Sequence, residues 1–249
     1  MLKIENVEIH GWEPAIRGMR NPKNSWANSD STNEENCDEC IYYEDYTVCK
    51  YNHIHECLNF KAGPNDFNLM TTLRNAGTDH RKFMRMIVVY MDVTAPLYWW
   101  KEYDTYKVGT VANSCSTMHK IAENEFTLDD FSCEHLGVYI PAEKNDGEEC
   151  FQNLWPVVMQ NIVTALNNAL DCYLRENDQE LKKAYWWQMI QLLPSSYNQR
   201  RTIMLNYEVL ANIYKSRRNH KLDEWHTFCD LIESLPYSEL ITGKENRSI

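Results

Sequence analysis

The stretch from Val93 to Lys120 constrains the fold of this chain more than any other. The residues before it, Phe83–Val93, are rich in Met, Ile, Val and Tyr and predict a long β-strand. Pro96 suits the first turn of a helix, so the strand is expected to pass directly into a helix that carries Trp99 and Trp100. Tryptophan pairs at helical positions are typical of core and subunit contacts, although they can also stack on a flavin or a base.

Other segments show the periodicity of regular structure. Alternating apolar and polar residues predict a strand over residues 2–10. Helical spacing and capping residues predict helices over 12–20, 65–75, 153–176, 178–193, from the cap Ser195-Ser196 to about Arg217, and over 222–235. Residues 106–120 give no clear pattern, and Trp186-Trp187 has the same two interpretations as the first tryptophan pair. Strands placed early and helices placed late predict an α+β fold.

Length and charge limit the classes of protein to which the chain can belong. The 249 residues suit a single domain over 1–249, with a loop-rich insert at about 30–62 and a polar tail at 239–249 that is expected to fray. A net charge of −11 argues against nucleic acid and against a membrane surface as the main partner. No apolar run approaches the ~18 residues of a membrane span, and the first residues lack the apolar core of a signal peptide. Together with nine cysteines, an odd number, these features favour a cytoplasmic protein with reduced thiols.

Four cysteines lie in the insert. Cys37, Cys40, Cys49 and Cys57 form a C-x2-C-x8-C-x7-C pattern, in which only the first pair has the spacing of zinc ligands. A metal would supply the core that this segment lacks, because it contains few aliphatic residues. The pattern therefore indicates a structural zinc site, with free thiols or an adventitious disulfide as the alternatives.

Several segments together resemble a known family. Ala95-Pro96 ends the predicted strand, a helix follows, and a signature region then falls on Thr105–Met118. Leu193-Pro194 precedes a later helix, and Ala15–Arg20 matches an early one. This arrangement resembles the flavin-dependent thymidylate synthases over most of the chain outside the insert. Most charged residues of the family signature are replaced, since Thr105-Tyr106-Lys107 stands where the family has Arg-His-Arg.

The resemblance implies a fold and an activity. The fold would be α+β, with an antiparallel-type sheet and long helices, assembled as a homotetramer. The activity would be that of a methyltransferase of nucleotide biosynthesis, which moves a one-carbon unit from a folate to C5 of dUMP or a related uridine-type nucleotide. FAD would be the cofactor, with NADPH and methylenetetrahydrofolate as co-substrates. The alternative is a non-catalytic homologue that binds a nucleotide or a partner and has lost the flavin.

The resemblance also assigns residues to sites. Arg217 falls on the arginine that polarises the N3 edge of uracil, although it could also be a surface arginine that completes a helix C-terminus. Lys107 keeps one positive charge of the signature, or is a solvated lysine. The positions matched to flavin-binding residues are His80, Lys107, Thr110, Asn113, Asn206 and Asn212, and those matched to the substrate site are Glu102, Thr117 and Arg217. Glu208 stands where an arginine is usual in the family.

Cys115 replaces a serine of the signature. A thiolate is a far stronger nucleophile than a hydroxyl, and addition to C6 of a pyrimidine activates its C5. His119, Lys107 or a helix N-terminus could lower the pKa of the thiol. Cys115 is therefore a candidate catalytic nucleophile, and the alternative is a small buried hydrophobic residue.

Overall fold

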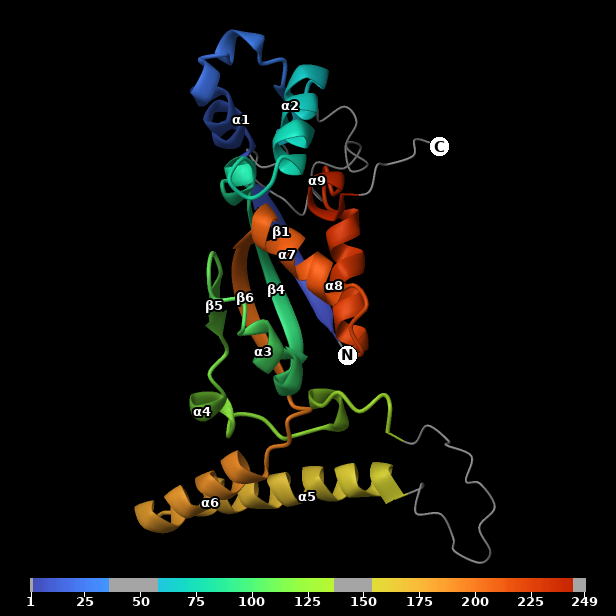
Figure 1. Ribbon diagram of the computed structural model, residues 1–249. Coiled ribbons are helices and arrows are strands. Elements are labelled where there is room, and N and C mark those ends of the chain that lie inside the picture. Colours follow the sequence, from blue (N-terminus) through green and yellow to red (C-terminus); the bar gives the residue numbers. More distant parts are fainter. Residues whose placement is uncertain (1, 36–57, 137–153, 244–249) are drawn as a thin grey trace, which may run out of the picture. The chain divides into compact units, whose positions relative to one another are not determined.

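The structure is a computed structural model that describes residues 2–35, 58–136 and 154–243 (Figure 1). Its residues group into two compact units. The first contains Met1–Glu8, Tyr90–Met204 and Arg217–Leu231, and the second contains Ile9–Val89, Leu205–Ser216 and Ile232–Ile249. No helix among the described residues is long and apolar enough to cross a membrane.

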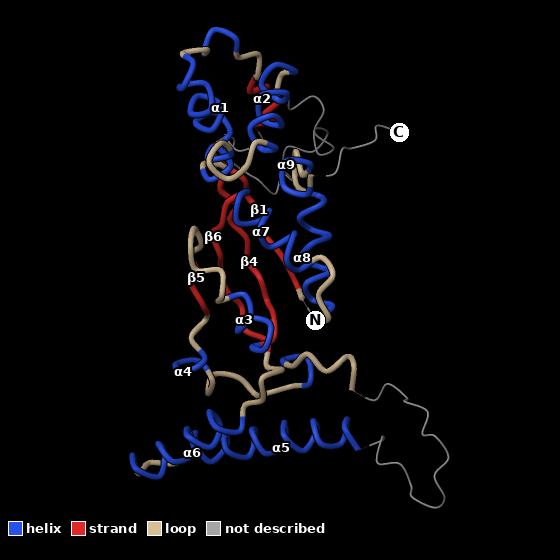
Figure 2. Tube along the Cα trace, viewed as in Figure 1, coloured by secondary structure: helices blue, strands red, loops and turns tan. Residues whose placement is uncertain are grey.

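A four-stranded sheet has the order β1-β4-β6-β5, and most of its residues belong to the first unit (Figure 2). Its strands are β1 (Lys3–His10), β4 (Val88–Pro96), β5 (Val111–Ser114) and β6 (Asn198–Asn206). The predicted α+β class with an antiparallel sheet is confirmed. Within β4, alternate side chains such as Met91 and Val93 are buried, which is why an apolar strand with a period of two forms here.

Two predictions of secondary structure were wrong. The strand predicted over Phe83–Val93 begins only at Val88, because Arg81–Arg85 forms a 3₁₀ helix that buries the adjacent residues Phe83 and Met84. Adjacent residues of a strand would point to opposite faces, so this burial suits a helical turn. The helix predicted from Ser195-Ser196 to Arg217 is instead a strand followed by a helix.

That strand is β6, and the helix after it is α7 (Tyr207–Arg217). β6 pairs antiparallel with β5, which puts Val111 opposite Met204 and Ser114 opposite Arg201. β5 and the short helix α4 (Thr117–Lys120) occupy the segment for which the sequence gave no pattern. β6 lies between β4 and β5 in the sheet, and pairing with these two strands outweighs the local helix signals.

The core of the first unit beside the sheet is aromatic. Helix α3 (Leu97–Tyr103) and helix α8 (Asp223–Ser234) bring Trp99 and Trp225 together with ring centroids 4.7 Å apart. Trp99 and Trp100 are fully buried, so the interpretation of this pair as core is confirmed. Pro96 is the last residue of β4 and the N-cap of α3, so the strand passes directly into the helix, as predicted.

Helices α5 (Leu154–Arg175) and α6 (Gln179–Leu192) lie side by side as a helical hairpin (Figure 1). Both match the predicted helices to within a residue at either end. The side chain of Asp178 caps α6 by accepting hydrogen bonds from the backbone N–H groups of Glu180 and Leu181. Their shared core contains Val163, Leu166 and Met189.

The second unit contains α1 (Trp12–Arg20), α2 (Pro64–Asn75), α9 (Glu239–Thr242) and the antiparallel strands β2 (Thr32–Glu35) and β3 (Leu58–Lys61). The two strands form the ends of the predicted insert. Within the tail that is predicted to fray, α9 buries Leu240 and Ile241. Gly11 precedes α1 with φ = +96°, and a Cβ there would lie 2.0 Å from the carbonyl oxygen of Met86.

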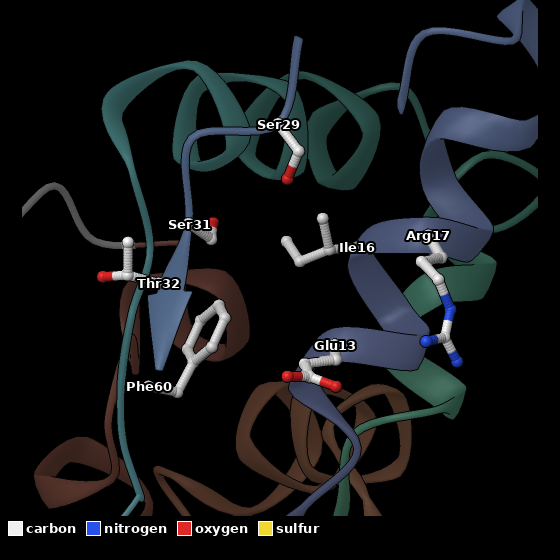
Figure 3. Close-up of a pocket in the computed structure, with 7 residues that line it drawn as sticks. All are labelled: Glu13, Ile16, Arg17, Ser29, Ser31, Thr32 and Phe60. Carbon is white, nitrogen blue, oxygen red and sulfur yellow. The ribbon is translucent and has the colours of Figure 1, made fainter. Parts of the chain in front are cut away.

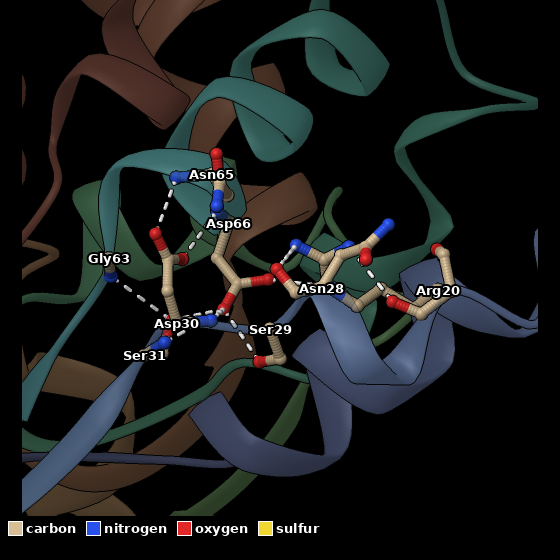
Figure 4. A network of polar contacts seen from close by, with 9 residues as sticks. Arg20, Asn28, Ser29, Asp30, Ser31, Gly63, Asn65 and Asp66 are labelled. Atoms are coloured by element: carbon tan, nitrogen blue, oxygen red, sulfur yellow. Dashed lines mark hydrogen bonds and ion pairs between the residues drawn. The ribbon is translucent and has the colours of Figure 1, made fainter.

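A buried carboxylate organises this unit (Figure 4). Asp66, at the start of α2, accepts a hydrogen bond of 2.6 Å from Nε of Arg20 and bonds of 2.7 and 2.6 Å from the hydroxyls of Ser29 and Ser31. Burial alone would raise the pKa of Asp66, but the serine and arginine hydrogen bonds lower it overall. Asp30 in turn accepts from the backbone N–H of Asp66 at 3.0 Å and so caps α2. The network ties residues 29–31 to both helices.

A second carboxylate, Asp92 on β4, predicts a pH dependence of stability. Hydrogen bonds from Thr202, Arg200 and Asn6 lower its pKa from 3.8 to about 2. The stabilisation is present above the unfolded pKa and is lost as the pH falls through the folded pKa. We expect Asp92→Asn to lower the free energy of unfolding by about 1–2 kcal/mol at pH 7, since Arg200 is half exposed and its bond is screened.

Urea denaturation from pH 7 to pH 2 measures this effect. The difference between wild type and Asp92→Asn should shrink below about pH 4 and be mostly lost at about pH 2. The exposed Asp129→Asn serves as the matched control, with little change expected at any pH. A difference that stays constant across this range would contradict the assignment to Asp92.

Candidate functional site

Arg217, the last residue of α7, lies at the centre of a polar cluster in the first unit. Its Nη1 donates to Oε2 of Glu102 at 2.6 Å, and its Nε donates to the hydroxyl of Tyr106 at 2.9 Å. Glu102 is on α3, and Tyr106 follows the end of that helix. The structure therefore brings together two residues that the sequence analysis placed in the substrate site, although 115 positions separate them.

Aromatic rings hold the guanidinium of Arg217 in place. Its Cζ lies 4.9 Å from the ring centroid of the buried Trp225 and 5.6 Å from that of Tyr106. The side chain of Arg217 is only 18% exposed. A planar cation stacked on a fixed indole loses little freedom when it binds a ligand, so this arginine is pre-organised.

His220 completes the cluster. Its Nε2 lies 3.2 Å from Oε2 of Glu102, the same oxygen that accepts from Arg217. Among the described residues no hydrogen bond reaches Oε1 of Glu102, and only two of the five N–H donors of Arg217 have partners. The cluster thus presents a carboxylate acceptor beside guanidinium donors.

A second charged cluster lies in the second unit. The carboxylate of Glu208, on α7, pairs with Arg85 and, at 3.3 Å, with Arg81. Burial would raise the pKa of Glu208, but the hydrogen bonds and charges of Arg85 and Arg81 lower it overall. Nη2 of Arg81 also donates to the side-chain oxygen of Asn212 at 3.1 Å. The positive charges of Arg81 and Arg85 thus offset the negative charge of Glu208, which stands where an arginine is usual in the family.

Other residues assigned to the flavin site have different surroundings. Asn206 is the last residue of β6, not part of the helix as expected, and its side chain caps α7 through the backbone N–H of Val209 at 3.0 Å. The hydroxyl of Thr110 donates to the carbonyl of Tyr106. The remaining three, His80, Lys107 and Asn113, are exposed.

Cys115 lies directly after β5 as an exposed free thiol, not as a buried hydrophobic residue. Its backbone is fixed, because its N–H donates to the carbonyl of Arg200 at 2.9 Å and its carbonyl accepts from Gln199 at 3.0 Å. The Gln199 amide also donates to the hydroxyl of Thr117 at 3.2 Å. In the described part of the chain, no hydrogen bond or ion pair joins the thiol to His119 or Lys107.

The predicted zinc ligands Cys37, Cys40, Cys49 and Cys57 lie outside the described residues. Within residues 2–35, 58–136 and 154–243, no group of three or more His, Cys, Asp or Glu side chains could hold a metal ion. The zinc site therefore stays a prediction, and metal analysis of the purified protein tests it.

A small pocket lies in the second unit (Figure 3). It has a volume of about 200 Å³ and is lined by Glu13, Ile16, Arg17, Ser29, Ser31, Thr32 and Phe60. The side chains of Ile16 and Phe60 are directed into it (Figure 3). Its volume is below the ~300 Å³ of typical ligand pockets, and the hydroxyls of Ser29 and Ser31 already bond to Asp66.

Comparison with known structures decides the fold. Thymidylate synthase X (ThyX) from Helicobacter pylori, solved with FAD and dUMP, superposes with a TM-score of 0.59 over 98% of both chains, at 14% identity. The chain has the ThyX fold. A second Helicobacter pylori ThyX structure gives a TM-score of 0.56 at 15% identity, over 96% of this chain and 99% of that one. The UMP/dUMP methylase PolB from Streptomyces cacaoi, bound to 5-Br dUMP, gives 0.52 at 13% identity, over 94% and 89% of the two chains.

No protein-family model and no curated protein matches the sequence. Within the ThyX fold, the sequence analysis missed His220, Trp225 and Arg81 as members of the charged clusters. His220 follows Arg217 by three residues in a basic run, and this spacing past a helix end was the available signal. Arg81 gave no such signal, because its partners Glu208 and Asn212 are more than 120 residues away.

Proposed function

We propose that the chain binds a pyrimidine nucleotide at the Arg217 cluster and transfers a one-carbon unit to C5 of the base. The observation that carries this proposal is the ion pair between Arg217 and Glu102, stacked on Trp225. A guanidinium held in this way can polarise a carbonyl of the ring, which makes C5 more electron-rich. The nucleotides bound in the solved structures of the same fold, dUMP in ThyX and 5-Br dUMP or 5-Br UMP in PolB, support this substrate class.

A flavin cofactor is part of the proposal, because ThyX of the same fold is solved with FAD. The Arg81, Arg85 and Glu208 cluster suits the diphosphate of FAD, since two guanidiniums and one carboxylate leave one net positive charge. The side chain of Arg85 is 53% exposed and within reach of an anion. His80 and Asn212, both exposed, would add donors beside these arginines. A bound flavin would supply the redox chemistry of the transfer.

Cys115 is the candidate nucleophile in this scheme. Addition of its thiolate to C6 would shift the electrons of the C5–C6 bond towards C5 and the polar atom on C4. C5 could then bond to the methylene carbon of the donor while a C–N bond of the folate breaks and the folate nitrogen keeps the electron pair. Loss of the C5 proton would then leave its electron pair to re-form the C5–C6 double bond. The bond between C6 and the sulfur would break, which releases the thiolate. The exposure of the thiol supports this role. NADPH as reductant and methylenetetrahydrofolate as donor belong to the proposal as well.

A non-catalytic binding protein is the second candidate. By the resemblance, Thr105 and Thr117 both stand where the family has an arginine. Each bonds to another group of the protein, since Thr105 donates to the carbonyl of Glu102 at 2.8 Å and Thr117 accepts from Gln199. The site therefore has fewer cations that could bind a phosphate than the family signature provides. The absorbance of the purified protein separates the two: a flavin spectrum supports the enzyme, and colourless protein that added FAD does not stabilise supports the binding protein.

We also propose that the protein forms an oligomer, a homotetramer by its resemblance. The α5–α6 hairpin supports this, because it exposes the large apolar side chains of Trp155, Val157, Val158, Leu174, Leu181, Trp187 and Leu192. Light scattering should give about four times the chain mass of 29.5 kDa. Trp155→Glu with Trp187→Glu should lower that mass, and Trp26→Glu, at a half-exposed site of the second unit, should leave it unchanged. A wild-type monomer at micromolar concentration would contradict the proposal.

A further inference from the structure

We propose that Glu102 sets the base specificity of the Arg217 cluster and favours a cytidine nucleotide over a uridine nucleotide. This inference rests on the proposed function, because it assumes that the cluster binds a pyrimidine. It goes beyond that function by naming the base. The argument starts from the hydrogen-bonding roles of the two side chains.

An ionised glutamate can only accept hydrogen bonds, and an arginine can only donate them. Arg217 donates to Oε2 of Glu102, and Nε2 of His220 lies 3.2 Å from the same oxygen, so Oε1 is left to accept from a ligand. The Arg217 donors not used by Glu102 and Tyr106 are left to bond to a ligand acceptor. The cluster therefore complements an edge that carries an N–H donor beside an acceptor.

The Watson–Crick edge of cytosine offers a partner to each of the two side chains. Its N4 amino group donates to a carboxylate, a pairing that proteins also use to read cytosine in nucleic acids. Its N3 and O2 are adjacent acceptors that match two parallel N–H groups of one guanidinium. Cytosine can therefore form three hydrogen bonds with this pair of residues.

Uracil fits the same pair less well. Its position 4 carries a carbonyl oxygen, which would face the Glu102 carboxylate without a proton between them. Shifting uracil so that its N3–H donates to Glu102 leaves Arg217 with a single carbonyl acceptor. The carboxylate also disfavours ionisation of N3, because it places a negative charge beside the ring. One charged hydrogen bond is lost in either pose, so the discrimination should be at least about 10-fold.

The test measures the affinities of CMP, dCMP, UMP and dUMP by isothermal titration calorimetry with the full chain. The wild type should bind dCMP at least about 10-fold more tightly than dUMP. Glu102→Gln should reverse this preference, because the glutamine amide can donate to O4 of uracil. The matched control is Glu125→Gln, which replaces an exposed glutamate of the same unit and should keep the wild-type preference.

The possible outcomes separate this inference from the proposed function. Tighter binding of dUMP than of dCMP by the wild type overturns the cytidine assignment and leaves the proposed function standing. A preference for dCMP that Glu102→Gln leaves unchanged overturns the role of Glu102. Binding of none of the four nucleotides overturns both proposals. Because the wild-type comparison needs no variant, the assignment can fail even if Glu102→Gln does not fold.

Discussion

Replacement of Arg217 with alanine is expected to weaken the binding of pyrimidine nucleotides by at least about 100-fold. The variant loses the guanidinium that stacks on Trp225 and bonds to Glu102 at 2.6 Å. It also leaves the Glu102 carboxylate without its main counter-charge, so that the site would repel a nucleotide phosphate. Calorimetric titration with dUMP and dCMP measures the loss.

Arg218→Ala is the matched control for this experiment. Arg218 is the next residue along the chain, is 36% exposed, and pairs with Asp230 at 2.7 Å instead of with Glu102. Its removal should change nucleotide affinity less than about threefold. Equal losses in the two variants would show a general effect of positive charge, and unchanged affinity in Arg217→Ala would place the binding site elsewhere.

Replacement of Asp66 with alanine is expected to cause the largest loss of stability, about 3–5 kcal/mol. Asp66 is fully buried, and its carboxylate bonds to Arg20, Ser29 and Ser31. Its removal leaves the guanidinium of Arg20, only 5% exposed, without a counter-charge. Urea denaturation followed by circular dichroism at pH 7 measures the change.

Asp66→Asn separates the charge from the hydrogen bonds. The amide oxygen can still accept from one serine, so this variant should lose less stability than Asp66→Ala. Nucleotide affinity is measured as a second readout of the same variants. It reports on the other unit, to which Arg217 and Glu102 belong. A loss below about 1 kcal/mol in Asp66→Ala would contradict the account of this network as the centre of the second unit.

Local sequence signals were sufficient to predict those helices whose formation depends on residues close together in the sequence. The helices α5 and α6 follow from apolar spacing, and the structure adds that Asp178 caps α6. The strand β6 could not be predicted in this way, because Ser195-Ser196 resembles a helix cap and Arg200-Arg201 is polar. Its conformation depends on pairing with β4 and β5, whose residues lie about 90 or more positions earlier.

The candidate site, too, could be predicted from the sequence only in part. The resemblance placed both Arg217 and Glu102 at a substrate site, and the structure joins them in one ion pair. Sequence alone did not indicate that His220 shares Oε2 of Glu102, since a turn after α7 brings it there. Nor did it show that Arg81 and Arg85 compensate Glu208, because that pairing joins segments more than 120 residues apart.

Release of tritium from the pyrimidine ring tests the central claim most directly. Transfer of a one-carbon unit to C5 must expel the hydrogen at that carbon, so a nucleotide labelled with tritium at C5 reports each turnover as labelled water. With FAD, NADPH and methylenetetrahydrofolate present, we expect the wild type to release tritium from dCMP or dUMP, and Arg217→Ala to release none above background. Absence of release by wild-type protein that binds the nucleotide would contradict the enzymatic account and leave the chain as a nucleotide-binding protein.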